Sequence, residues 1–203
     1  LATYTTAEMS RHLSRATHRL RSKVYFPETR ASSALSFTRS ATLPFATVTA
    51  PTDWWHPIYL NNANHEYKFH YMQPDALRQL TSDDFGYEFV EHAFAIDGLN
   101  LVIYHDTTET LNLQYYSKYL VATVTTGTAK ETFNTDGTTG DTLIPDNEEL
   151  LIREVLLFLA HKEPNSQDKY QELKLEQDEA IREQNLRYPS EALEILERPD
   201  FIG

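Results

Sequence analysis

Residues 94–119, FAIDGLNLVIYHDTTETLNLQYYSKY, decide the fold expected for this chain. Two stretches with apolar side chains at every second position flank a polar break at residues 106–109. The apolar positions are Leu99, Leu101 and Ile103 before the break, and Leu111, Leu113 and Tyr115 after it. This alternation is typical of antiparallel strands with one buried face. Asp97-Gly98 adds a tight turn, because glycine accepts the positive φ of a type I′ turn. The stretch therefore predicts a β-meander of at least three strands.

The composition describes a folded chain with an uneven charge. Of its 203 residues 40% are hydrophobic, and none is cysteine, which excludes disulfides and thiolate metal sites. The formal net charge is −12; residues 1–40 are basic, and the remainder is acidic, most densely at 172–183. Such a chain is a poor general binder of nucleic acid. We expect basic and acidic surfaces to meet, within one chain or between copies. The longest apolar run, residues 155–160, is far shorter than the ~20 residues of a membrane span.

A helix is expected at residues 5–24, before the sheet. Thr5 and Glu8 have the spacing of a capping box, and Pro27 ends the helix. Its apolar stripe steps by three or four residues and consists of Met9, Leu13, Ala16, Leu20 and Val24. The opposite, basic side carries His12, Arg15, Arg19 and Lys23, and it is either a contact for phosphate or an acidic partner, or an ordinary solvated face.

Two helices are expected after the sheet. The first begins at Pro145-Asp146 and is apolar on nearly every side over residues 150–160, so it should be buried on most faces. The second runs over residues 166–186 and has acidic outer faces. Before both helices, the Thr/Gly-rich residues 122–142 predict a loop that projects as an arm, with Phe133 as its single aromatic residue.

These elements predict an α+β fold. Its core is a helical bundle of the N-terminal helix with two C-terminal helices, which carries an antiparallel β-sheet or meander as an insertion, together with an extended loop and tail. The chain is expected to form one structural domain overall. Its segments are the N-terminal helix and connection (1–40), the antiparallel β region (41–121), the projecting loop (122–143), the C-terminal helical hairpin (144–188) and a docking tail (189–203).

Motifs for catalysis or phosphate binding do not occur in the sequence, which lacks GxGxxG, GxxxxGK[ST], GxSxG and HExxH. His65, His70, His92 and His105, with Asp106, could converge on a metal ion. They lack a recognised ligand spacing, however, and we expect them to be scattered over the surface and the core edge. An enzyme would require a convergent cluster such as His92, His105 and Asp106. We therefore predict no catalytic residue, no cofactor and no metal.

Aromatic residues in two places are candidates for contacts. Trp54 and Trp55 lie in a rigid turn; we expect one to anchor the turn in the core and the other to be exposed for a partner. Tyr115, Tyr116 and Tyr119 could form a platform for a carbohydrate. We favour the alternative, in which Tyr115 is in the core and its neighbours belong to the sheet surface or to a subunit contact.

Short motifs mark the order of these elements. The turn at residues 50–54 reads APTDW, a strand–Asp-Gly–strand step follows, and residues 111–116 read LNLQYY. A buried helix after Pro145-Asp146 and a charged final helix complete the order. Over about residues 45–187 the chain resembles the head-to-tail adaptor (head completion) proteins of tailed bacteriophages, especially those of short-tailed phages. That family has an LPxDF-like turn and an LxLxYY strand at these places. It usually also has a second helix before the sheet and a PxP element, which have no counterpart here.

The resemblance implies a structural virion protein without catalysis. Such adaptors form a ring of twelve subunits beneath the portal, extend the DNA channel and provide the surface on which the tail assembles. The implied partners are further copies of this chain, the portal protein and a tail or nozzle protein, while genomic DNA passes without specific binding. The implied location is the head–tail neck of the virion, assembled in the host cytoplasm, with no membrane and no cofactor involved.

Named residues are expected to carry these roles. The apolar helix at 150–160 should pack with the stripe over residues 9–24. The channel, through which DNA slides without adhering, should be lined by Glu172, Glu176, Glu179 and Glu183. Contacts with the portal or with neighbouring subunits should come from Trp54, Trp55, Phe133, Phe201 and Ile202. Two other interpretations stay open: a monomeric β-rich module that binds a glycan or other ligand, and another phage neck or tail protein.

Overall fold

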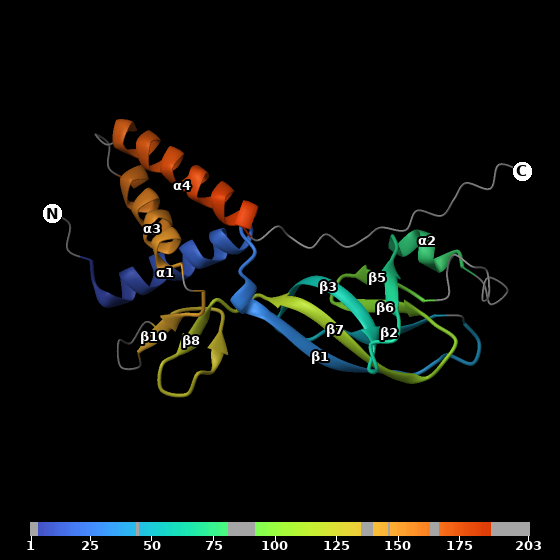
Figure 1. The fold of residues 1–203 in the computed structure, drawn as a ribbon. Coiled ribbons are helices and arrows are strands. Elements are labelled where there is room, and N and C mark those ends of the chain that lie inside the picture. The colour runs from blue at the N-terminus through green and yellow to red at the C-terminus, as the bar shows by residue number, and fades with distance from the viewer. Residues whose placement is uncertain are drawn as a thin grey trace, which may run out of the picture. The chain divides into compact units, whose positions relative to one another are not determined.

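The computed structural model describes residues 4–43, 45–80, 92–134, 140–145, 147–162 and 167–187. The backbone forms two compact units (Figure 1). The helical unit consists of Leu1–Arg30 and Tyr116–Ser190, and the sheet unit contains Ala31–Tyr115. The chain therefore leaves the helical unit after its first helix and returns to it after the sheet.

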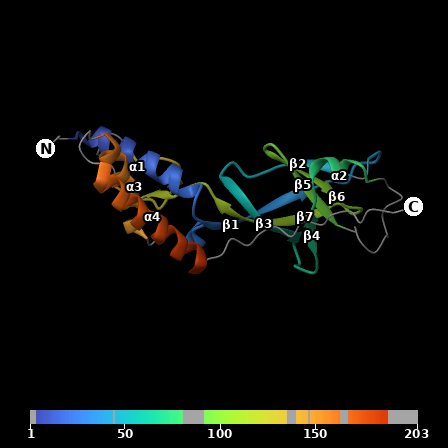
Figure 2. The same cartoon turned by 90° about the horizontal axis from the view of Figure 1, so that it is seen from above.

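The sheet unit is built on one seven-stranded mixed sheet. Its strands are β1 (Arg30–Phe37), β2 (Phe45–Thr49), β3 (Trp54–Asn62), β4 (Lys68–Tyr71), β5 (Ala93–Asp97), β6 (Asn100–Tyr104) and β7 (Glu109–Ser117). They lie in the order β1-β7-β3-β4-β5-β6-β2 and curl strongly (Figures 1 and 2). β4 and β5 are parallel, and their connection contains the short helix α2 (Pro74–Arg78). The pairs β3–β4, β5–β6 and β2–β6 are antiparallel.

The predicted fold class is wrong. The chain is α+β, but the curled seven-stranded mixed sheet dominates it, with four helices among the described residues; it is not a helical bundle with a small antiparallel insertion. Two features escape the sequence patterns. β1 has the small and polar sequence RASSALSF, which predicts a connection, and it is buried only toward its end, at Leu35 and Phe37. The parallel pairing of β4 with β5 needs a crossover, which no alternation of residues encodes.

Residues 94–119 form strands, but not the predicted three-stranded meander. β5 and β6 do pair through a tight turn at Asp97-Gly98, where Gly98 has a φ of 62°. β7, however, lies between β1 and β3, and the other edge of β6 pairs with β2. Alternation determines which face of a strand is buried, not which strand lies beside it. Leu99, predicted on the buried face, is instead exposed in the turn.

Two cores cover the central strands on both faces. One contains Phe37, Leu60, Phe94, Ile103, Leu111 and Leu113, among others. The second lies around α2 and contains Met72, Leu77, Leu80, Ala93, Ala95, Val102 and Tyr104. β6 contributes alternate residues to the two cores, so it is apolar at nearly every position, as strands buried on both faces are. In β7 the predicted alternation is confirmed, since Leu111, Leu113 and Tyr115 are buried.

The helical unit contains three helices and a small sheet. Its elements are α1 (Thr6–Arg21), the 3-10 turn η1 (Pro27–Thr29), β8 (Val121–Thr123), β9 (Ala129–Lys130), β10 (Asp141–Leu143), α3 (Glu148–Lys162) and α4 (Gln167–Arg187). α3 lies between α1 and α4 and packs against both (Figures 1 and 2). The three short strands have the order β10-β8-β9.

Local signals in this unit are confirmed. The Thr5 hydroxyl accepts a hydrogen bond from the Glu8 backbone N–H at 3.3 Å, and the Glu8 carboxylate accepts one from the Thr5 N–H at 2.9 Å, which completes the predicted capping box. The predicted packing of the two apolar helices is also present, in a core that contains Ala16, Leu20, Val24, Leu150, Leu151 and Val155. The residues predicted as a projecting loop hold β8, β9 and β10, although 135–139 lie outside the described residues.

Candidate functional site

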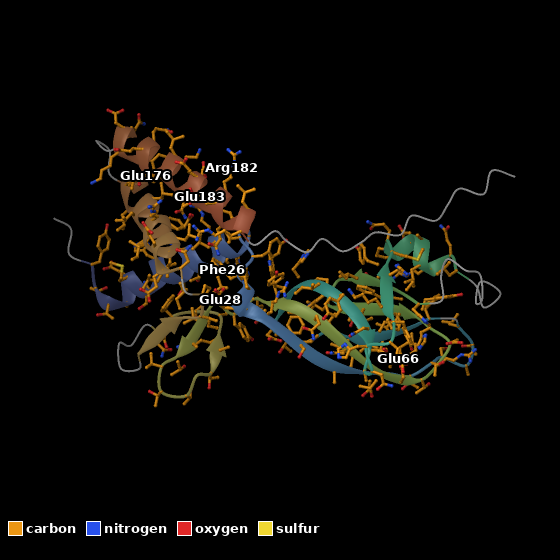
Figure 3. The ribbon with its side chains drawn as sticks, viewed as in Figure 1. Phe26, Glu28, Glu66, Glu176, Arg182 and Glu183 are labelled. Carbon is orange, nitrogen blue, oxygen red and sulfur yellow. The ribbon has the colours of Figure 1, made fainter. Side chains whose placement is uncertain are left out.

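The surface that stands out in the helical unit is an open groove between α3 and α4. It has a volume of about 490 Å³. α3 contributes Glu149 and Arg153 to its lining, and α4 contributes Glu176, Glu179, Glu183 and Arg187. Four carboxylates thus face two guanidinium groups, so the groove is acidic on balance. Figure 3 shows the side chains of Glu176 and Glu183 on α4.

The carboxylates on α4 form a stripe, defined here as Glu172, Glu176, Glu179 and Glu183. Their spacing of four, three and four residues places them on one face of the helix, and all four are exposed. These are the residues predicted to line a DNA channel; the structure brings them together and places three of them in the groove. Within the described part of the chain none of the four forms an ion pair; Arg153 of α3 pairs with Glu149 at 2.6 Å and donates to the Glu176 backbone carbonyl at 3.2 Å.

The outer side of α3, next to this groove, is apolar and uncovered. Ile152 is 54% exposed and Leu156 is 42% exposed, one helical turn apart. The sequence predicts a helix that is buried on most faces, and α1 and α4 cover only part of it. A helix that is apolar on nearly all sides is normally found inside a protein or an assembly. Within the part of the chain that the structure describes, this face therefore has no element packed over it.

The outer side of α1 is basic. Arg11, Arg15 and His18 are exposed and follow one another at intervals of four and three residues, so they share a face. The opposite side of the same helix packs into the core through Ala16 and Leu20. Neither Arg11 nor Arg15 forms an ion pair with another described residue. The helical unit thus presents a basic face on α1 and an acidic groove between α3 and α4.

A buried carboxylate joins the three helices. Glu154 of α3 lies 3.2 Å from the Lys23 ammonium and 3.6 Å from the Arg19 guanidinium. Gln177 of α4 donates from its amide nitrogen to the Glu154 carboxylate at 3.2 Å and to the Leu150 carbonyl at 3.1 Å. This network links the end of α1 to α3 and α4. It sets the arrangement in which the basic face and the groove are displayed.

The sheet unit contains a second polar cluster, centred on His105. The ring Nδ1 of buried His105 lies 3.1 Å from His92 Nδ1 and 3.6 Å from the exposed Asp106 carboxylate. Its Nε2 contacts the Glu109 carboxylate, which also accepts the hydroxyl proton of Tyr67. The Tyr67 hydroxyl is itself 3.2 Å from His105 Nε2. The structure therefore brings together the three residues that an enzyme was expected to need, and adds Tyr67 and Glu109, which the sequence analysis missed.

This cluster resembles a structural network more than a catalytic site. Both ring nitrogens of His105 are engaged, and the rings of Phe37 and Phe69 lie 5.8 and 5.2 Å from its own, so it has no nitrogen to offer a substrate. Burial, followed by the hydrogen bond to the Glu109 carboxylate, raises the pKa of Tyr67 above its usual value, which keeps its hydroxyl a donor. Among the described residues, no group of three His, Asp or Glu side chains is placed to hold a metal.

The side chains of the other two candidate histidines are not part of this cluster. His65 is exposed beside Asn61, and His70 is on β4, where its backbone N–H donates to the His92 carbonyl at 2.9 Å. The carbohydrate platform does not exist as a surface, because Tyr115 and Tyr116 are both buried. Tyr115 donates its hydroxyl proton to the Asp53 carboxylate at 2.9 Å, and burial together with this bond raises the pKa of Tyr115.

The candidate contact residues are placed as follows. Trp54 and Trp55 begin β3 directly after the turn at Thr52-Asp53 and do not lie in the turn itself, where the sequence predicted them. Trp54 packs against the core of the sheet unit and Trp55 is exposed, which agrees with the predicted split between them. Phe133 packs against the core of the helical unit, which leaves it only partly accessible. Phe201 and Ile202 lie outside the described residues.

No protein-family model matches this chain, and no curated protein sequence matches it. The resemblance to phage adaptors accordingly rests on the short motifs and the order of elements. None of the helices that the structure describes combines the length and the apolar character needed to cross a membrane.

Proposed function

We propose that this protein is a ring-forming adaptor of a tailed bacteriophage, which joins the portal to the tail and extends the DNA channel. The resemblance of the APTDW turn, the Asp-Gly step and the LNLQYY strand to that family supports the proposal. It implies a structural virion protein in the head–tail neck, with the portal and a tail or nozzle protein as partners.

The observation that carries the proposal is the uncovered apolar face of α3. Ile152 and Leu156 are exposed on a helix whose other apolar residues are buried or partly buried. Burial of such side chains stabilises an assembly by roughly 25 cal/mol for each Å² removed from water. A face of this kind, used head-to-tail against a different surface of the next copy, closes a ring when the rotation between copies allows it. Twelve copies is the ring size that the resemblance implies.

The charge of the chain suits a channel for passing DNA. A subunit with a formal net charge of −12 repels a polyanion, so that DNA is guided without adhering. The alternative is a monomeric glycan-binding module that uses Tyr115, Tyr116 and Tyr119 or the pair Trp54 and Trp55. The burial of Tyr115 and Tyr116 counts against its tyrosine platform, and of the tryptophans only Trp55 is exposed.

The proposal is tested by measuring native mass. The purified chain, alone and with its portal protein, should form a ring or a ring–portal complex. Replacing the uncovered face, Ile152→Ser with Leu156→Ser, should shift the mass toward the monomer without loss of helix signal at 222 nm. The matched control, Leu43→Ser with Leu99→Ser, removes two exposed apolar side chains from the sheet unit and should assemble normally. Persistent monomers of the unaltered chain in the presence of portal would refute the proposed function.

A further inference from the structure

The helical unit displays two surfaces whose charges and spacings match. The basic face of α1 is formed by Arg11, Arg15 and His18, and the acidic side of the groove by Glu176, Glu179 and Glu183. Each set spans eight residues, whose seven steps of about 1.5 Å extend over about 10 Å along an α-helix. Both sets are exposed, so both are available to a partner.

We infer that α1 of one copy docks antiparallel along α4 in the groove of the next copy, a contact that rests on the proposed ring. Read in opposite directions, the two helices have the same intervals of four and three residues. The antiparallel alignment pairs Arg11 with Glu183, Arg15 with Glu179 and His18 with Glu176, and it places Glu8 opposite Leu186, one residue from Arg187. Both arginines thus meet carboxylates, and the His18 imidazole meets a third, which fixes the register of the contact.

The parallel alignment lacks this complementarity. In that direction the intervals are four and three residues on α1 but three and four residues on α4. When Arg11 lies opposite Glu176 and His18 opposite Glu183, Arg15 therefore falls opposite Ala180, which carries no charge. The sequence of charges along the two helices therefore selects one direction.

The contact joins two copies and is not made within one chain. α1 packs into its own core through Ala16 and Leu20, on the side opposite to Arg11 and Arg15. Its basic face therefore points away from the α3 that forms its own groove. A surface and its complement that cannot meet in one subunit generate a head-to-tail contact, which is the kind that forms rings.

The docked helix also covers part of the apolar face. Ile152 and Leu156 lie on the outer side of α3, next to Glu149 of the groove. Arginine side chains cover apolar surface with their methylene stems while their guanidinium groups reach carboxylates. In this docking, Glu176, Glu179 and Glu183 lie in a contact between subunits. They would therefore not line the DNA channel, which is the role that the sequence predicts for them.

Charge reversal with rescue tests this contact. Glu179→Lys with Glu183→Lys should weaken self-association by at least about tenfold, because two attractions become repulsions. Arg11→Glu with Arg15→Glu should do the same. Combining all four changes restores opposite charges at both pairs, so association should return to within about threefold of the unaltered chain. The matched control, Asp168→Lys with Asp178→Lys, makes the same change of charge on α4 away from the groove lining and should have no effect.

Association is measured by sedimentation velocity and native mass at low salt, with portal protein present, after the helix signal at 222 nm has shown that each variant is folded. Raised salt should weaken association of the unaltered chain, since exposed ion pairs are screened. Rings that tolerate both reversals, or a fourfold variant that fails to recover, would overturn the docking while the proposed function stands. An unaltered chain that never assembles would overturn both.

Discussion

Removing the two cations around Glu154 should destabilise the helical unit more than removing Glu154 itself. The Glu154 side chain is only 1% exposed, whereas those of Arg19 and Lys23 are 57% and 38% exposed. Arg19→Met with Lys23→Met would leave a buried carboxylate with Gln177 as its single side-chain donor among the described residues. Glu154→Leu would leave two cations that already reach water.

The magnitude follows from these distances and exposures. At 3.2 and 3.6 Å and an effective dielectric constant of about 20, each cation attracts the carboxylate by about 5 kcal/mol. Much of this offsets the cost of desolvating the carboxylate, and the exposed cations are partly screened. Leaving a buried charge uncompensated typically costs about 3–5 kcal/mol. We expect the free energy of unfolding to fall by about 3 kcal/mol in the double variant. In Glu154→Leu it should fall by about 1 kcal/mol or less, because Gln177 keeps its hydrogen bond to the Leu150 carbonyl.

Urea denaturation with two probes measures the effect. Circular dichroism at 222 nm follows α1, α3 and α4, which hold most of the helical residues described. The chain has two tryptophans, Trp54 and Trp55, both on β3, so their fluorescence follows the sheet unit. The loss of stability should appear in the helix signal. Two results would refute this account of the buried carboxylate: a double variant whose free energy of unfolding falls by less than about 1 kcal/mol, or a Glu154→Leu variant that is destabilised more than the double variant.

Three further changes have defined outcomes. Thr5→Ala removes the cap of α1 and should lower the free energy of unfolding by about 1 kcal/mol. Urea denaturation followed at 222 nm measures this, and an unchanged midpoint would contradict it. Glu109→Ala removes the carboxylate that His105 Nε2 contacts and should lower the free energy of unfolding by about 2 kcal/mol, measured by urea denaturation with tryptophan fluorescence. Asp106→Ala should change it little, because the Asp106 carboxylate is exposed. The raised pKa of Tyr115 favours its protonated form in the folded state, so stability should fall above pH 10 by up to about 1.4 kcal/mol per pH unit. Tyr115→Phe should flatten this decline, and an equal slope in both proteins would argue against it.

Much of the local structure could be predicted because its causes are local. The capping box needs only Thr5 and Glu8, three residues apart. The tight turn needs only a glycine that accepts positive φ, at Gly98. The acidic stripe on α4 follows from helical periodicity, so its residues could be grouped before any fold was known. The basic side of α1 was predicted correctly only at Arg15, because His12 is buried and Arg19 and Lys23 contact the buried Glu154.

The polar cluster could be predicted only in part. His92, His105 and Asp106 were named as a set that an enzyme would need, and the structure does bring them together. Tyr67 could not be anticipated, because it reaches Glu109 across a sheet whose strand order is not sequential. A usable signal was the spacing of Glu109 four residues after His105, on the far side of a short polar turn. The hydrogen bonds of the polar cluster depended on which strands became neighbours.

By itself, the sequence determined the helices, most of the strands, the buried face of β7 and the charges that the outer helices carry. These depend on intervals of two to four residues, over which backbone geometry and side-chain polarity act directly. Only the tertiary structure decided that β7 lies beside β1 and β3, that β4 and β5 run parallel, and that the sheet dominates the fold. Such pairings join segments far apart in the chain, and they are selected by the shared burial of several strands at once, which no short stretch specifies.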